Sequence, residues 1–128
     1  MREIVKVFKV LADETRLRIL NLLQKRECCV CEVMQALEVS QSKASRGLTA
    51  LYDIGFLKLR KYGLWSLYSI DREGISNYQL EIIEAVKEAL ADNKLTALDK
   101  ERLKTAVRGT SRREPGLADD VSVKVTSI

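Results

Sequence analysis

A change of hydrophobic period at Gly55 constrains the fold of this chain more than any other feature. Before it, helical spacing predicts a short helix at residues 31–37 and a longer one at Gln41–Asp53, with a tight break of three residues between them. After it, residues 57–70 alternate apolar and polar side chains around Tyr62-Gly63, which is typical of a β-hairpin. Two such helices followed at once by a hairpin predict a winged helix-turn-helix.

The rest of the regular structure is predicted to be helical, so the expected fold class is mainly α with one small β-hairpin. Asp13 and Ser40 are good N-caps, because their side-chain oxygens can accept from the first free N–H groups of a helix. The other predicted helices lie at Arg2–Leu11 and at residues 14–24, 75–91 and 97–107.

Length and composition exclude several classes of protein. The 128 residues favour one domain, and we expect a winged helix-turn-helix with its dimerisation helices at residues 1–95, a helical extension at 96–108 and a flexible tail at 109–128. No apolar run approaches the roughly 20 residues that span a bilayer, and the N-terminus lacks a signal-peptide core. We therefore expect a cytoplasmic protein with reduced thiols and no membrane contact. Histidine, the commonest general base, is absent, and we expect no enzyme.

Positive charge gathers in the middle of the chain. Residues 40–63 hold five basic groups and one acid, a balance of +4, whereas residues 64–95 hold three basic groups and six acids, a balance of −3. The polar face of the Gln41–Asp53 helix carries Ser, Thr, Gln, Lys and Arg, which suit base edges and phosphates. We predict a double-stranded DNA interface of Gln41, Ser42, Lys43, Ser45, Arg46 and Thr49 on this helix, with Lys58, Arg60 and Lys61 on the hairpin.

The helix at residues 75–91 carries an apolar arc of roughly 160°, which is wider than one core contact requires. One interpretation is a helix well buried in its own domain. The alternative, which we favour for so small a subunit, is that part of the arc packs on a second copy. A two-fold dimer would hold its DNA-reading helices about one DNA turn apart, roughly 34–36 Å, and would read a palindrome. The arc contains Ile75, Tyr78, Ile82, Ile83, Ala85, Val86, Ala89 and Leu90.

All three cysteines, Cys28, Cys29 and Cys31, lie within four consecutive positions. One interpretation is that one of them is a buried small hydrophobe, and another is a redox switch. A zinc staple is disfavoured, because four ligands are normal and one chain offers three thiols and no His. A third interpretation is a trap for soft metal ions, which clustered thiolates select.

The spacing of Cys29 and Cys31 limits how they can act together. Residues i and i+2 point about 200° apart around an α-helix, so both can bind one ion only if this turn unwinds or lies outside the helix. We expect binding to cost the first turn of the helix that precedes the DNA-reading helix.

Three stretches carry a resemblance to a known family. In order along the chain they are VLADETRLRILNLL, ECCVCEV and SQSKASRGLTALYDIGFLKLRKYGLWSLY. They resemble the ArsR/SmtB family of metalloregulatory repressors from about residue 4 to residue 92. The resemblance implies a homodimer that occupies its operator when metal-free and leaves it when metal binds. It also implies dimerisation through residues 2–11 and 75–91, which assigns Ile4, Val5 and Phe8 to the interface together with Ile75, Tyr78, Ile82, Val86 and Ala89.

The resemblance also implies an inducer. In the family, the motif ELCVCDL marks sensors of As(III) and Sb(III), so Cys29 and Cys31 carry over as the ligand pair, with no permanently bound cofactor. The third ligand is either Cys28 or a small cellular thiol. The alternative function is a thiol- or persulfide-sensing repressor that uses the same cysteines. At the hairpin turn, where family members often have Arg or Lys, this chain has Leu64.

Overall fold

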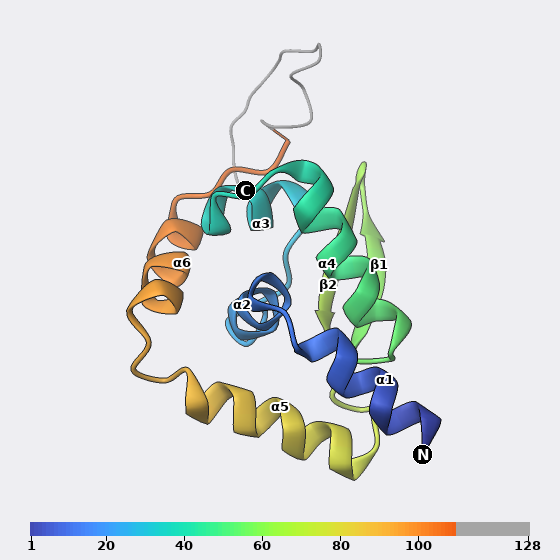
Figure 1. Ribbon diagram of the computed structural model, residues 1–128. Coiled ribbons are helices and arrows are strands. Elements are labelled where there is room, and N and C mark those ends of the chain that lie inside the picture. The colour runs from blue at the N-terminus through green and yellow to red at the C-terminus, as the bar shows by residue number, and fades with distance from the viewer. Residues whose placement is uncertain (110–128) are drawn as a thin grey trace.

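The computed structural model describes residues 1–109, whose helices and hairpin follow the expected order (Figure 1). The helices are α1 (Arg2–Leu11), α2 (Glu14–Leu22), α3 (Val30–Leu37), α4 (Gln41–Asp53), α5 (Asn77–Ala89) and α6 (Lys94–Lys104). The strands β1 (Leu57–Tyr62) and β2 (Trp65–Ile70) pair antiparallel, which confirms the predicted fold class. Within the described range, none of the helices combines the length and the apolar character needed to cross a bilayer. Residues 110–128, most of the predicted tail, lie outside that range.

The core is built around α2, which lies at the centre of the other helices (Figure 1). Its Ile19 and Leu20 are fully buried, and so are Leu48 and Leu51 on the apolar face of α4. Burying a side chain of this size stabilises the fold by about 1.5–3 kcal/mol. The polar face of α4 therefore has to point away from α2.

Local contacts fix the helix-turn-helix. Lys43 N donates to the Ser40 side chain (3.1 Å), so α4 begins where its cap predicts. Glu38 adopts the left-handed conformation (φ 57°), which ends α3 and turns the chain within three residues. At Gly47 an added Cβ would lie 2.6 Å from Ile19 Cδ1. The missing side chain at Gly47 lets α2 and α4 pack closely.

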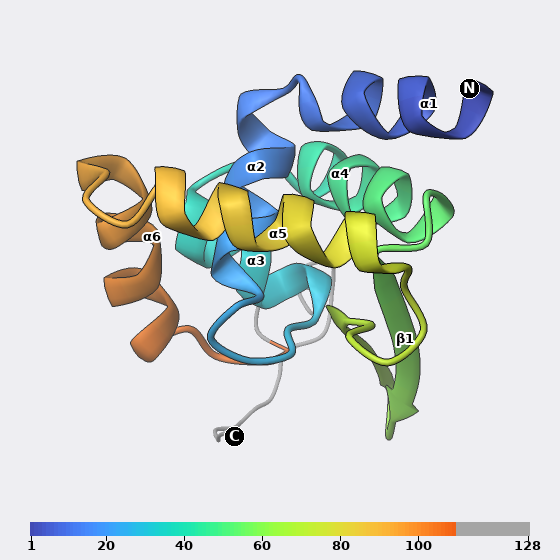
Figure 2. The same ribbon diagram turned by 90° about the horizontal axis from the view of Figure 1, so that it is seen from below.

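The hairpin forms the wing and projects from the helical body (Figure 2). Its register pairs Leu57 with Ile70 and Tyr62 with Trp65. The turn is therefore Gly63-Leu64, one residue later than predicted, because Tyr62 still belongs to the ladder. Gly63 has φ 61°, a conformation that glycine adopts readily in a two-residue hairpin turn.

Several helix boundaries differ from the prediction. Helix α2 ends two residues early, at Leu22, because Gln24 N donates to Asn21 O, three residues back, in a tighter turn (3.2 Å). Helix α5 starts at Asn77 and ends at Ala89, inside the predicted 75–91. Helix α6 occupies Lys94–Lys104 instead of 97–107, because Asn93 caps it by accepting from Thr96 N (3.0 Å).

A buried carboxylate holds α6 against the helix-turn-helix. Asp99, 1% exposed, accepts two hydrogen bonds from Arg18 of α2 (2.8 and 3.0 Å) and one from Arg102 (3.2 Å). The same arginines donate to the last carbonyls of α3, Arg18 to Leu37 O (3.0 Å) and Arg102 to Ala36 O (2.7 Å). These carbonyls have no partner within their own helix. Helix α6 therefore packs as part of the winged body.

We expect Asp99→Ala to destabilise the fold by about 3 kcal/mol, because it leaves the mostly buried Arg18 guanidinium without its counter-charge. Glu101→Ala on the same helix is the matched control, since it removes only an exposed ion pair to Lys104. Urea unfolding of both variants measures the difference. Equal stabilities would contradict this role of Asp99.

Candidate functional site

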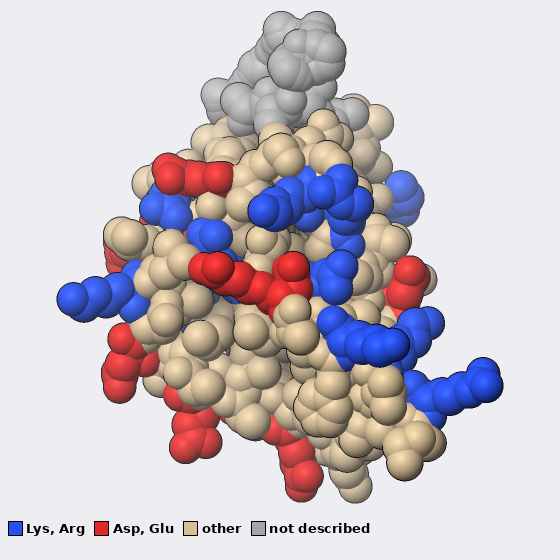
Figure 3. All heavy atoms as spheres, in the orientation of Figure 1, with Lys and Arg blue, Asp and Glu red and all other residues tan. Residues whose placement is uncertain are grey.

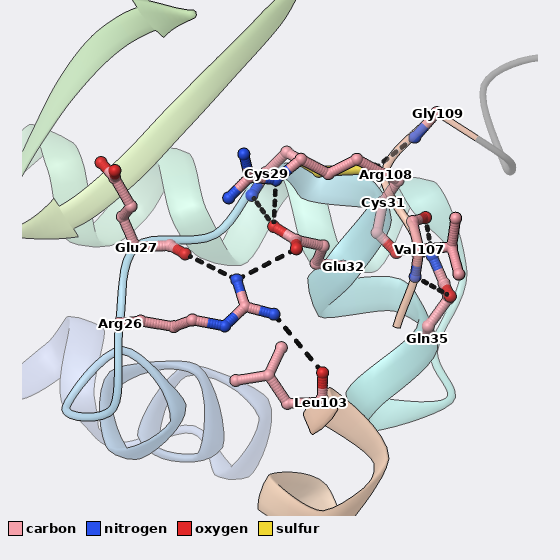
Figure 4. Close-up of a disulfide and its surroundings, with 10 residues drawn as sticks. All are labelled: Arg26, Glu27, Cys29, Cys31, Glu32, Gln35, Leu103, Val107, Arg108 and Gly109. Atoms are coloured by element: carbon pink, nitrogen blue, oxygen red, sulfur yellow. Dashed lines mark hydrogen bonds and ion pairs between the residues drawn. A yellow bond between two sulfur atoms is a disulfide. The ribbon is translucent and has the colours of Figure 1, made fainter. Parts of the chain in front are cut away.

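Cys29 and Cys31 are joined by a disulfide at the start of α3 (Figure 4). Cys29 is the N-cap, with an extended backbone (φ −89°, ψ 170°), and Cys31 lies in the first turn. The two Cα atoms are 5.4 Å apart and both side chains are buried. The sulfurs meet because Cys29 lies outside the helix. The pair thus comes together with α3 intact from Val30, through the arrangement in which one cysteine lies outside the helix, and the cost of binding an ion stays a prediction. For this structure, the expectation of reduced thiols is wrong.

Cys28 faces the other way, into the main core. Its backbone N–H and carbonyl both bond to Tyr68 of β2 (3.0 and 2.8 Å), and its thiol donates to Arg26 O (3.6 Å). Burial, helped by the charge of Glu32, raises the pKa of Cys28 to about 12. The structure does not bring Cys28 together with the pair, and residues 1–109 contain no group of three His, Cys, Asp or Glu side chains arranged to hold a metal ion.

A second buried carboxylate, that of Glu32, fixes the start of α3. One oxygen accepts from Cys29 N (3.0 Å) and from Arg108 Nε (3.1 Å), and the other accepts from Arg26 Nη1 (3.0 Å) (Figure 4). The Cys-x-x-Glu spacing is that of a capping box, a signal present in the sequence. The two arginines, six residues before and 76 residues after Glu32, leave no such local signal.

The segment after α6 lies over the cysteine pair. Gln35 donates to Val107 O (2.8 Å) and accepts from Val107 N (2.9 Å), and Gly109 N donates to Cys31 Sγ (3.5 Å). Gly109 has φ 86°, and a Cβ there would lie 3.0 Å from a ring carbon of Trp65. Gly109, the first residue of the predicted tail, is buried, and the rest of that predicted tail lies outside the described residues.

A cavity of about 190 Å³ opens onto the cysteine pair. It lies between the start of α3, the start of α4 and the turn of the wing. Besides the two cysteines, its walls are Val30, Met34, Gln41, Leu64, Trp65 and Ser66. Any group bound to the cysteine sulfurs therefore faces both DNA-reading elements predicted from the sequence.

An ion pair also joins the cysteine segment to the wing. Glu27 accepts two hydrogen bonds from Arg60 of β1 (2.9 and 2.6 Å), and Arg60 stacks over the ring of Tyr62 at 5.4 Å. Arg60 holds the pKa of Glu27 below its usual range. Arg60, predicted as a phosphate contact, is thus also a link between the wing and the residue before Cys28.

The predicted DNA contacts share one side of the molecule. All nine are exposed, and in Figure 3 most of the visible Lys and Arg side chains lie on the half that carries α4, the hairpin and α1. Two of these side chains donate to a nearby hydroxyl: Arg46 to that of Ser42, which is also a predicted contact, and Lys61 to that of Ser66 on β2 (3.0 Å). The exposed set is Gln41, Ser42, Lys43, Ser45, Arg46, Thr49, Lys58, Arg60 and Lys61.

The predicted dimerisation residues divide into two groups. On α1, Ile4, Val5 and Phe8 are exposed, Phe8 by 54%. Ile75, Tyr78, Ile82 and Val86 are half-buried, whereas Ala89 is exposed. Three of the half-buried residues, Ile75, Ile82 and Val86, also pack against the core. The apolar arc of α5 thus serves its own domain in part.

Comparisons with known proteins fit this geometry. Residues 13–58 match the family described as bacterial regulatory protein, arsR family. The arsenic resistance transcriptional regulator ArsR1 of Pseudomonas putida is 36% identical over 119 residues, covering 90% of this chain and 89% of that protein. This chain belongs to the ArsR family. An alignment over 90% of it necessarily includes α6, so the likeness extends beyond residue 92.

Other ArsR relatives agree. The arsenical resistance operon repressor of Escherichia coli is 48% identical over 67 residues, which are 52% of this chain and 57% of that protein. The solved homodimeric winged helix-turn-helix DNA-binding domain Mb0332 of Mycobacterium bovis, a possible ArsR-family regulator, superposes with a TM-score of 0.59 at 26% identity. The superposition covers 73% of this chain and 82% of the Mb0332 chain, so the two share the winged fold.

The buried Cys28 thiol predicts alkaline instability. Above the ordinary thiol pKa of about 8.5 the unfolded chain loses this proton, while the folded chain keeps it up to about pH 12. Stability should therefore fall as pH rises through this window, by at most about 1.4 kcal/mol per pH unit from this group. Cys28→Ala should be less stable at neutral pH but show a shallower slope in urea unfolding between pH 8 and 11. If the wild type and Cys28→Ala lose the same free energy of unfolding per pH unit, the buried Cys28 thiol is not the cause of the alkaline instability.

Proposed function

We propose that this ArsR-family protein is a transcriptional repressor that binds operator DNA as a homodimer and leaves it when As(III) or Sb(III) binds Cys29 and Cys31. The observation that carries the proposal is the cavity at the cysteine pair, whose walls include Gln41 of α4 and Leu64 of the wing. The names of its relatives, arsenic and arsenical resistance regulators, support the metalloid class.

In the DNA-bound form, α4 lies in the major groove and the wing lies beside the backbone. Arg46 and Gln41 have the side chains that pair with guanine and adenine edges, while Lys43 and Lys58 meet phosphates. Two copies place their α4 helices about one DNA turn apart, so the operator is a palindrome. Because phosphate contacts dominate the affinity, binding weakens steeply as salt rises.

The start of α3 prepares the cysteine pair for a soft ion. Once the disulfide is reduced, the two sulfurs lie at a helix N-terminus, which favours negative charge, and Gly109 N–H points at Cys31 Sγ. Thiolates prefer soft metalloids to hard cations. A ligand that fits the cavity only when Gln41 or the wing turn moves favours the conformer that binds DNA weakly, with a coupling of about 1–3 kcal/mol.

A second candidate function rests on the disulfide itself. Loss of two electrons and two protons from the Cys29 and Cys31 thiols, to an oxidant such as a cellular disulfide or persulfide, forms this bond. A repressor that used this change would read thiol redox state through the same cavity walls.

Release of DNA separates the two candidates. With reduced protein on DNA from its own upstream region, arsenite and antimonite should release the wild type, whereas Zn(II) should not. Cys29→Ser and Cys31→Ser should need at least about 100-fold more arsenite, because the coupling is lost. Cys28→Ala, a matched change in the same segment, should respond as the wild type does.

A band-shift titration measures these outcomes. Arsenite release that survives both serine substitutions would overturn the metalloid proposal. Release by diamide alone, reversed by a reductant, with no response to arsenite, would establish the redox function in its place.

A substitution on the exposed apolar face of α1 tests whether the protein forms the proposed dimer. Phe8→Asp places a charge on the exposed apolar face that the proposal assigns to the partner subunit, so it should yield monomers and lose operator binding. Leu98→Asp on α6 is the matched control, because Leu98 is 52% exposed against 54% for Phe8. Sedimentation velocity measures both. A dimeric Phe8→Asp protein would contradict the assignment.

A further inference from the structure

We infer that the cysteine site is suited to a trivalent arsenical that carries one apolar organic group, R–As(OH)₂, in preference to inorganic arsenite. This inference rests on the proposed function and names the ligand class of the same site. It follows from the number of thiols at the site and from the chemistry of the cavity beside them.

Once the Cys29–Cys31 disulfide is reduced, the site offers two thiols. Cys28 faces the core on the far side of the segment, with its backbone bonded to Tyr68 and its thiol bonded to Arg26 O. The whole sequence contains no fourth cysteine and no histidine. Cys29 and Cys31 are therefore the only thiolates that one chain can bring to a ligand here without refolding this segment.

Two thiols match the valence of a monosubstituted arsenical. In the reaction R–As(OH)₂ + 2 R′SH → R–As(SR′)₂ + 2 H₂O, two As–O bonds break and two As–S bonds form. The two thiol protons leave in the two waters, and the oxidation state of arsenic does not change. Arsenite bound to the same pair keeps one As–OH group, which needs a polar partner or a third thiol from outside.

The cavity provides space for the organic group. Its volume of about 190 Å³ exceeds that of an engineered cavity of about 150 Å³ that binds benzene. Besides the cysteines, four of its lining residues are apolar: Val30 and Met34 from α3, Leu64 from the wing turn and Trp65 from β2. Met34 has a flexible, polarisable side chain that adapts to groups of different shape. An apolar substituent on arsenic would therefore be removed from water here, whereas a hydroxyl on arsenic would have the side chains of Gln41 and Ser66 as its polar partners among the lining residues.

The same group would act on DNA binding. Leu64 belongs to the wing turn and the cavity reaches Gln41 at the first turn of α4. A substituent that packs against these walls couples their positions to its own, so it shifts the equilibrium between the DNA-binding conformers more strongly than arsenite does.

The test uses full-length protein that is reduced, freed of reductant under nitrogen and bound to fluorescent operator DNA. Arsenite, methylarsenite and phenylarsonous acid are titrated while DNA anisotropy is followed. The emission of Trp65, the single tryptophan of the chain, reports ligand binding independently of DNA release. We expect half-release by methylarsenite and phenylarsonous acid at concentrations at least about tenfold lower than that of arsenite, a difference of about 1.4 kcal/mol.

A cavity-filling variant separates the role of the walls from the general affinity of arsenicals for dithiols. Met34→Phe reduces the space beside the pair and leaves both thiols in place. Its DNA affinity is measured first without arsenical. Phenylarsonous acid should then lose its advantage over arsenite, while arsenite keeps its own midpoint.

The outcomes are distinct. Arsenite releasing DNA at the same or a lower concentration than the organic forms, or an unchanged phenyl advantage in Met34→Phe, would overturn this inference and leave the proposed function standing. A change in Trp65 emission with no DNA release by any arsenical would overturn the proposed function itself.

Discussion

The buried carboxylate of Glu32 is the interaction on which the arrangement of this site depends. A buried charge needs partners, and here they come from the residue that caps α3, from Arg26 before it and from Arg108 after α6. The same carboxylate therefore sets where α3 starts and where the chain after α6 lies. Removing either arginine would leave the other to balance a charge that water reaches poorly.

The start of α3 in turn decides what each cysteine does. Consecutive residues of an extended backbone point to opposite sides, so Cys28 enters the core while Cys29 faces the cavity. Cys31, in the first turn of the helix, comes back to the same side as Cys29. A motif of three close thiols is thereby divided into a reactive pair and a structural, protonated core residue.

The cysteine segment is attached to the wing at several points. Backbone hydrogen bonds join Cys28 to Tyr68, an ion pair joins Glu27 to Arg60, and the cavity at the pair touches Leu64. These contacts belong to the hairpin, whose strand β1 carries the predicted phosphate contacts Lys58, Arg60 and Lys61. A change at the sulfurs therefore needs no long path to reach the DNA-reading surface.

The sequence by itself determined the local elements: the caps at Asp13 and Ser40, the exposed polar face of α4, the hairpin and the ECCVCEV motif. Each is written in residues a few positions apart, so periodicity and spacing are enough to predict it. The tertiary structure decided which two cysteines meet, that Asp99 holds α6 against α2, and that Gly109 covers Cys31. Two of those outcomes join groups 78 and 81 positions apart, and the other depends on which side of the backbone faces the core. Neither property leaves a pattern in neighbouring residues.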